Sequence, residues 1–376
     1  MIDNSEEANG LTIVTPNFNS SGFLEKLLLS IAKNRDDSIP LEVLIIDDSD
    51  PVEAERTRVL CQKYNARYLW CQGNVSRKRN YGVENAKHDI ILFTDSDCEI
   101  SANTIPEHSK LSSTGDGIGA MLGLVEFSGP INWVWRIVER TGLIGSFAFA
   151  KRMPFAPWGI TANLSVKRRV FQEVGGFDET FLKAPGGEDV DIGLRINDTG
   201  YKIITNTQAL IYHTRLTWNR LGKMFRRSFA YGRAHYHVIK KHKNRSDYEF
   251  PRLVSTFLIV GLALLLRLVI SFSWYTLAGF LIYPLVVLIF QFILSKRALE
   301  LTLKEFPRQM AAYVLDLAFE TGLIAESFRH YDLSGLWIKI IYSDVQLIKE
   351  RPQKIIQTWS LLLGLVALLI LLSVEM

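Results

Sequence analysis

The first half of the chain alternates short apolar runs with segments of helical spacing. Residues 11–15, 41–46 and 90–93 are largely hydrophobic, which is typical of strands buried inside a parallel sheet. Between the first two runs, residues 22–33 place apolar side chains at helical intervals. This order of strand, helix and strand predicts an α/β fold with a Rossmann-like parallel sheet.

Acidic residues follow the second and third apolar runs directly. Asp47 and Asp48 end the second run, and Asp95 and Asp97 end the third. The carboxyl ends of parallel strands meet at the edge of the sheet where ligands bind, so we expect these turns to lie side by side. Two carboxylates one residue apart suit Mg²⁺ or Mn²⁺ held against substrate phosphates. The alternative for an isolated Asp-x-Asp is an acidic turn before a helix.

Six short motifs follow one another along the chain. They are TPNFN at 15–19, IIDDS at 45–49, RKRNYG at 77–82, TDSD at 94–97, VGGFD at 174–178 and GEDVDIGLR at 187–195. This ordered set resembles the family 2 glycosyltransferases of the GT-A fold. It is most similar to the membrane-bound members that build bacterial exopolysaccharides and lipid-linked glycans, such as the succinoglycan-type enzymes. The resemblance extends over roughly residues 10–235.

The resemblance implies an enzyme that moves a sugar from a nucleoside-diphosphate sugar, taken to be a UDP-sugar, to a hydroxyl of a lipid-linked or exopolysaccharide-precursor glycan acceptor. Asp48 is implied to hydrogen-bond the nucleobase or ribose, with Asp47 beside it. The other implied donor-pocket residues are Pro16, Asn19, Arg79, Asn80, Asp95 and Ser96. The basic run at 77–79 opens a predicted helix, whose N-terminus favours phosphate. Helix capping by one aspartate and a solvated charge run are the structural alternatives.

Asp97 is implied to bind the divalent cation directly, and Asp95 to bridge to the ribose or the metal. His213 ends another strand-like run and is implied as a third metal ligand, with a purely structural histidine as the alternative. The cation would neutralise the charge that develops on the departing nucleoside diphosphate.

The base is implied to lie in the second acidic motif. Gly186 and Gly187 bring the backbone close to substrate, and Glu188 and Asp189 follow at the start of a predicted helix. Asp189 matches the family's base, Glu188 would orient the acceptor, and Asp191 would cap the helix. Because no motif supplies a second nucleophile, we expect a single displacement that inverts the anomeric centre.

The composition changes near Pro251. Three apolar stretches then follow, at residues 253–272, 275–294 and 359–374. The first two are long enough to span a bilayer, whereas the third is shorter; a buried core helix is the alternative for each. Basic residues flank these stretches, and the link at 273–274 carries no charge. The positive-inside rule therefore places the N-terminal domain and residues 295–358 on the cytoplasmic side.

We accordingly expect a cytosolic GT-A domain at residues 1–235 and a membrane region at residues 236–376. The protein would be a multi-pass component of the cytoplasmic (inner) membrane. The net charge of +4 fits contact with anionic membrane lipids, and no pattern indicates nucleic acid. The three cysteines lack metal-binding spacing.

Residues 226–233 read RRSFAYGR, where processive members of the family carry Gln-x-x-Arg-Trp. This departure favours the addition of one sugar per encounter. Arg226, Arg227 and Arg233 are expected to hold an acceptor phosphate or anionic lipid. Two alternatives stay open: transfer to polyprenyl phosphate or a membrane glycolipid, and a nucleotidyltransferase.

Overall fold

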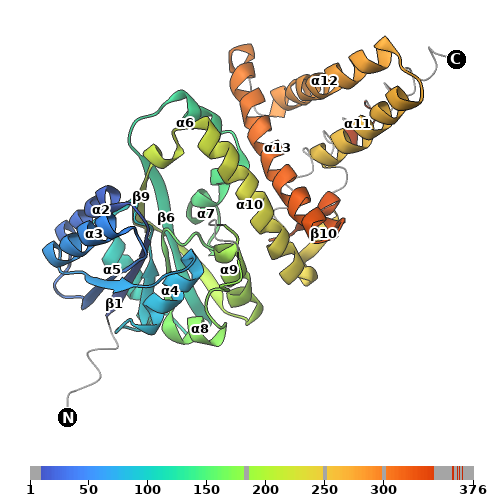
Figure 1. Cartoon of the computed structure of the whole chain (residues 1–376). Coiled ribbons are helices and arrows are strands. Elements are labelled where there is room, and N and C mark those ends of the chain that lie inside the picture. The colour runs from blue at the N-terminus through green and yellow to red at the C-terminus, as the bar shows by residue number, and fades with distance from the viewer. Residues whose placement is uncertain are drawn as a thin grey trace. The chain divides into compact units, whose positions relative to one another are not determined.

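The structure, a computed structural model, describes residues 10–181, 186–248, 252–298 and 302–342, together with Thr358, Trp359, Leu362, Gly364 and Val366. The chain forms two compact units (Figure 1). The first contains Met1–Asn132 and Leu143–Arg220, and the second contains Trp133–Gly142 and Leu221–Met376. The units thus divide at Arg220, whereas the predicted division near residue 235 falls inside helix α10 (Leu221–Lys241).

In the described part of the first unit, the strands form a nine-stranded mixed sheet. Its order is β3-β2-β1-β4-β8-β6-β9-β5, with β7 paired to β9. The strands are β1 (Leu11–Asn17), β2 (Leu41–Asp47), β3 (Arg67–Trp70), β4 (Ile90–Phe93), β5 (Cys98–Ile100), β6 (Ile118–Ser128), β7 (Phe155–Ala156), β8 (Leu164–Lys167) and β9 (Lys202–Thr214). Strand β1 lies parallel to both β2 and β4, so the ends of these three strands meet at one edge of the sheet. This parallel core confirms the sheet predicted from the three apolar runs.

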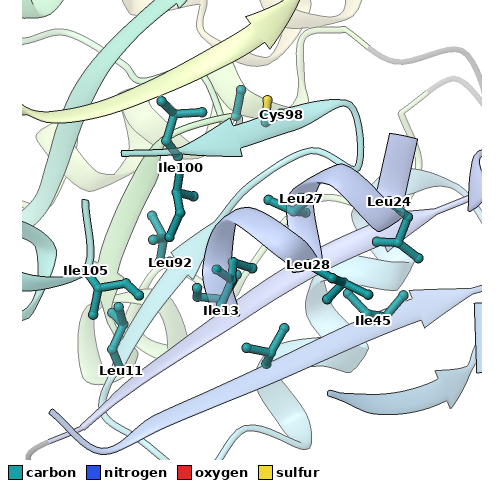
Figure 2. Packing of buried hydrophobic residues seen from close by; sticks show 14 of the residues in the cluster. Leu11, Ile13, Leu24, Leu27, Leu28, Ile45, Leu92, Cys98, Ile100 and Ile105 are labelled. Atoms are coloured by element: carbon teal, nitrogen blue, oxygen red, sulfur yellow. The ribbon is translucent and has the colours of Figure 1, made fainter. Parts of the chain in front are cut away.

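Helices cover both faces of the sheet (Figure 1). They are α2 (Ser21–Lys33), α3 (Pro51–Lys63), α4 (Val75–Glu84), α5 (Thr104–Ser109), α7 (Phe149–Arg152), α8 (Arg168–Glu173) and α9 (Glu188–Asp198). Successive side chains of β1 point to opposite faces of the sheet, so they pack into two different hydrophobic cores. Leu11 and Ile13 pack with buried residues of α2 and α5 (Figure 2), whereas Val14 packs with buried residues of α4, α8 and α9.

Strand β1 continues two residues beyond the predicted end at Thr15. Pro16 pairs with Ile46 and Asn17 with Asp47, although the PNFN segment was expected to stop the strand. The pairing of β1 with β4 ends at Val14, so Pro16 has a strand neighbour on one side only. A proline, which lacks the amide donor, is tolerated at such an edge position.

In the second unit, α10 crosses α13 (Phe306–Arg329) at two glycines. A Cβ atom on Gly232 would overlap the carbonyl group of Phe319, and one on Gly322 would overlap that of Phe229. Small residues let the two backbones approach this closely. The unit also contains α6 (Trp133–Val138) and the antiparallel pair β10 (Ser246–Tyr248) and β11 (Ile338–Ile340).

Among the described residues of the second unit, two helices are long and apolar enough to cross a membrane. They are α11 (Leu253–Ile270), with a mean hydropathy of 2.6, and α12 (Trp274–Ala298), with 2.2 over Trp274–Ile293. Their bounds lie close to the predicted spans at 253–272 and 275–294. The third predicted span, at 359–374, lies outside the described residues except for four helical positions, the first of which is Trp359.

Candidate active site

Asp47, the last residue of β2, accepts hydrogen bonds from side chains of the neighbouring strands β1 and β3. Its Oδ1 accepts hydrogen bonds from Asn17 Nδ2 at 2.8 Å and Ser49 Oγ at 2.6 Å, and its Oδ2 accepts one from Tyr68 OH at 3.2 Å. The residue has no exposed surface. Buried and satisfied in this way, Asp47 supports the loop that carries Asp48.

Asp48 is the more accessible carboxylate of the pair. Lys78 Nζ forms an ion pair with Asp48 Oδ1 and donates to the carbonyl oxygen of Asn17 at 2.7 Å, while the Gly73 amide donates to Asp48 Oδ2 at 3.2 Å. Lys78 is buried, and the predicted site omitted it. Gly82 lies against the sheet, and Lys78 precedes it by four residues in the same helix. Residues four apart lie on one face of a helix, so this spacing could have placed Lys78 on the face of α4 that packs on the sheet.

The predicted residues Asn19 and Ser96 join the loops that follow β1, β2 and β4. The Asn19 amide donates to Ser49 Oγ at 2.7 Å, and its side chain donates to Asp50 Oδ2 at 2.7 Å. Ser96 Oγ lies 2.9 Å from Ser20 Oγ. The three loops therefore form one connected rim, as the parallel strands predicted.

Asn80 anchors the loop at residues 175–178, the GGFD loop. Its Nδ2 donates to the carbonyl oxygen of Phe177 at 2.8 Å and to Glu179 Oε1 at 2.9 Å, and its Oδ1 accepts from the Phe177 amide at 2.9 Å. Asp191, expected to cap α9, is fully buried and accepts from Arg195 Nη2 at 2.6 Å. Arg195 also donates to the carbonyl oxygens of Val174 and Gly176. These contacts stabilise the loop beside the site.

Arg79 connects the two acidic motifs of the predicted site. Its Nη2 donates to Asp95 Oδ1 at 3.2 Å, and its Nη1 donates to Glu188 Oε1 at 3.0 Å. The second oxygen of Glu188 accepts from the Gly186 amide at 2.8 Å. The side chains of Arg79 and Glu188 are almost completely buried. The structure thus brings the Asp-x-Asp turn and the start of α9 into one site.

Asp189 lies beside this pair in the first turn of α9. Gly187, the residue before the helix, has φ of 87°, a left-handed conformation that favours glycine. The amide of Val190 donates to Asp189 Oδ1 at 2.8 Å. Burial, followed by the charge of Glu188, raises the pKa of Asp189 to about 7. A carboxylate with such a pKa can accept a proton near neutral pH.

Asp97 and His213 meet where β5 pairs with β9. The distance from Asp97 Oδ1 to His213 Nε2 is 3.3 Å, and Thr217 Oγ1 donates to Asp97 Oδ2 at 3.0 Å. A carboxylate and an imidazole at this spacing can hold a divalent cation. The predicted site omitted Thr217, which follows the strand end with no motif to mark it.

Asp95, also a predicted metal ligand, lies outside the cluster formed by Asp97 and His213. Within the described residues, the potential ligand atoms of Asp97, Cys98 and His213 lie within 4.8 Å of one another. Burial and the charge of Asp97 raise the pKa of the Cys98 thiol well above its usual range, so this thiol stays protonated. The carboxylate of Asp95 contacts Arg79, which leaves Asp97 and His213 as the closest predicted ligand pair.

Comparisons with known proteins identify the family and the fold. The family model for Glycosyl transferase family 2 matches residues 12–175, and that for Glycosyl transferase family group 2 matches residues 133–294. Mannosyltransferase PcManGT from Pyrobaculum calidifontis, solved in complex with GDP-Man and Mn²⁺, superposes with a TM-score of 0.50 at 16% identity. That match covers 82% of this chain and 86% of the mannosyltransferase, and it shows the shared fold.

Curated relatives match at low identity. Glycosyltransferase AglE of Haloferax volcanii is 22% identical over 61% of this chain and 73% of its own length. Validoxylamine A glucosyltransferase of Streptomyces hygroscopicus subsp. jinggangensis is 24% identical over 53% of this chain and 54% of its own length. The O-antigen biosynthesis protein RfbC of Myxococcus xanthus is 26% identical over 36% of this chain, which spans only 12% of that protein.

The mixed sheet and the solved structure together show a GT-A fold. The chain belongs to the family 2 glycosyltransferases. Family and fold support sugar transfer from a nucleotide-sugar donor.

Proposed function

We propose that this chain is a membrane-anchored, inverting glycosyltransferase. It transfers one sugar at a time from a UDP-sugar to a hydroxyl group of a lipid-linked or exopolysaccharide-precursor acceptor. The contact that carries the proposal is the bridge from Arg79 to Asp95 and Glu188, because it joins the donor side of the site to the residue beside the candidate base, Asp189.

The donor side is formed by the strand-end loops. Asp48, held by Lys78, is the carboxylate that binds the nucleobase or ribose, and Arg79 supplies positive charge near the diphosphate. A bound Mn²⁺ or Mg²⁺, held by Asp97 and His213 with Asp95 nearby, would neutralise charge on the departing nucleoside diphosphate. Thr217 orients Asp97 for this task.

The acceptor side is formed by the start of α9. Asp189 takes the proton from the acceptor hydroxyl as that oxygen bonds to the anomeric carbon. The bond from the anomeric carbon to the diphosphate breaks, and its electron pair leaves with the nucleoside diphosphate. Attack from the side opposite the leaving group inverts the anomeric configuration. Glu188, fixed by Arg79 and by the Gly186 amide, orients the acceptor.

The membrane part of the proposal is supported by α11 and α12, which are long and apolar enough to span a bilayer. We place the GT-A unit in the cytoplasm and the chain in the inner membrane as a multi-pass protein, because basic residues flank both helices and their link is uncharged. A membrane-embedded lipid carrier would then bring the acceptor to the enzyme. The absence of Gln-x-x-Arg-Trp at 226–233 supports single additions.

Purified full-length protein incubated with a panel of UDP- and GDP-sugars and Mn²⁺ tests the proposal. We expect release of UDP, with product formation dependent on a lipid-linked acceptor and an inverted linkage by NMR. Release of pyrophosphate would instead identify a nucleotidyltransferase. A retained anomeric configuration would refute the single displacement. Asp189→Asn, which is nearly isosteric but a poor base, should bind donor normally and lose about 10²–10⁴-fold in kcat; normal turnover would contradict its role.

A further inference from the structure

One end of the α10–α13 helix pair carries a cluster of two histidines and a glutamate. His237 lies on α10, Glu326 lies in the last turn of α13, and His330 is the residue that directly follows this helix. His237 Nε2 is 3.1 Å from Glu326 Oε1, and His330 Nε2 is 3.5 Å from the same oxygen. All three potential ligand atoms lie within 4.8 Å of one another. The cluster belongs wholly to the second unit and is distinct from the Asp97–His213 pair.

We propose that His237, Glu326 and His330 bind a Zn²⁺ ion. Zinc binds histidine nitrogen and carboxylate oxygen at roughly 2.0–2.2 Å in a tetrahedral arrangement. Neighbouring ligand atoms of such a tetrahedron are about 3.4 Å apart, which follows from those bond lengths. The two distances to Glu326 Oε1 fall on either side of this value.

The donor set selects the kind of metal. Two imidazoles favour zinc and its transition-metal neighbours, whereas Mg²⁺ and Ca²⁺ require mainly oxygen ligands. About half of the His330 side chain is exposed, so water can supply the fourth ligand.

The residues around Glu326 hold its carboxylate in position to act as a metal ligand. Its side chain is only 4% exposed, and Arg233 Nε donates to its second oxygen, Oε2, at 2.6 Å. With Oε2 held by Arg233, Oε1 is the oxygen that faces both histidines. An outer partner such as Arg233 orients the carboxylate that binds a metal.

The ring of His330 is also held in place. Tyr236 stacks on it with ring centroids 5.5 Å apart, and the hydroxyl of Tyr236 donates to Asp332 Oδ2 at 3.1 Å. Bound zinc would join α10 to α13 at this end, beyond the glycine crossing at Gly232. The inferred role is thus a structural clasp within the unit that contains the candidate membrane spans.

Metal analysis of the full-length protein tests the inference. Wild-type protein and a His213→Ala variant, which lacks the ligand at the other site, are loaded with Zn²⁺, dialysed and analysed for bound metal. We expect the His213→Ala protein to retain one zinc per chain at the clasp and wild-type protein to retain at least that one. Co²⁺ in place of zinc should give the visible absorption of a tetrahedral site with nitrogen and oxygen ligands.

His330→Ala and His237→Ala should each weaken zinc affinity by more than about 100-fold, the upper range for loss of an outer-shell partner. Lys240→Ala is the matched control, because Lys240 pairs with Asp332 at 2.9 Å on the same helix end but lies outside the three ligands. It should leave zinc affinity unchanged. Chelator competition on wild-type protein needs no variant and gives the affinity directly.

Three outcomes would overturn the inference. They are no zinc retained by His213→Ala protein, equal zinc affinity in wild type and His330→Ala, and a cobalt spectrum that keeps octahedral features. Each would leave the cluster as a hydrogen-bonded contact between two helices.

Discussion

Arg79 and Glu188 form a buried hydrogen-bonded ion pair, with Nη1 and Oε1 separated by 3.0 Å. The two residues lie 109 positions apart in the chain. Arg79 also reaches Asp95 across 3.2 Å. The guanidinium of Arg79 therefore links the Asp-x-Asp turn to the first turn of α9. Its positive charge offsets the negative charges of the carboxylates on either side.

The Arg79–Glu188 pair should behave as a coupled unit in a double-mutant cycle. Arg79→Met leaves Glu188 buried without its charged partner, which typically costs about 3–5 kcal/mol. Glu188→Gln should also destabilise the protein, because it leaves part of the Arg79 charge unbalanced. The double variant should lose less stability than the sum of the two single variants, as measured by denaturant unfolding. Strictly additive losses would show that the contact contributes nothing of its own.

The sequence was sufficient to predict the parallel core and the positions of its acidic turns. Continuous apolar runs identify buried strands, and the residues after them must lie at the ligand-binding edge. Asp48 and Asp97 were placed correctly at this edge by that reasoning.

Side-chain direction was harder to predict than position. Asp47 and Asp48 are adjacent and chemically identical, yet the last position of β2 buries Asp47 against Asn17 and Tyr68. The same limit applies in α4, where Lys78 is buried and Arg77 is not. Which member of a pair turns inward depends on the register of neighbouring elements, and these elements come from distant parts of the chain.

Arg233 illustrates contacts that only the tertiary structure supplies. It was expected to hold an acceptor phosphate or anionic lipid, but its Nε donates to Glu326, which is 93 residues away. No local pattern links these positions. Arg226, by contrast, is exposed, and its predicted contact with an acceptor phosphate or lipid stays a prediction.

Removing the metal should abolish sugar transfer, and a Thr217 variant should reduce metal affinity only in part. Thr217→Val removes the donor that orients Asp97 and should weaken Mn²⁺ affinity by about 10–100-fold, with a parallel loss of turnover at limiting Mn²⁺. Electron paramagnetic resonance of free Mn²⁺ measures the affinity. Thr205→Val is the control, since that hydroxyl donates to the Met153 carbonyl elsewhere along β9. Full activity in EDTA, or equal effects of the two variants, would contradict the metal site.

Cysteine labelling should test the membrane topology. Cys61, Cys71 and Cys98 are all buried, so single introduced cysteines can be labelled against a low background. A membrane-impermeant reagent added to intact cells should modify a cysteine at Ser273 and leave one at Lys243 unmodified. Permeabilised cells provide the control, in which Lys243→Cys becomes reactive. The reverse pattern would place the donor pocket away from cytoplasmic nucleotide sugars and refute the proposed orientation.

The pH dependence of transfer should report on Asp189, whose raised pKa of about 7 comes from burial and the charge of Glu188. Below that pH the carboxyl group is protonated and cannot accept the acceptor proton, so kcat/KM should fall as pH decreases through about 7.

The Glu188→Gln variant tests whether the titration belongs to Asp189, because the direction of the resulting pKa change can be predicted. A neighbouring negative charge favours the protonated form of Asp189, and its removal therefore favours the carboxylate. The same substitution removes the negative partner of Arg79, and the uncompensated positive charge of Arg79 also lowers the pKa of Asp189. The acidic limb of the kcat/KM profile should accordingly move to lower pH in Glu188→Gln, even though the maximal rate falls. Glu179→Gln is the matched control: Glu179 is a partly exposed acid that contacts Arg77 and Asn80, and its neutralisation should leave the limb in place. A limb that stays near pH 7 in Glu188→Gln, or that moves equally in Glu179→Gln, would assign the titration to a group other than Asp189.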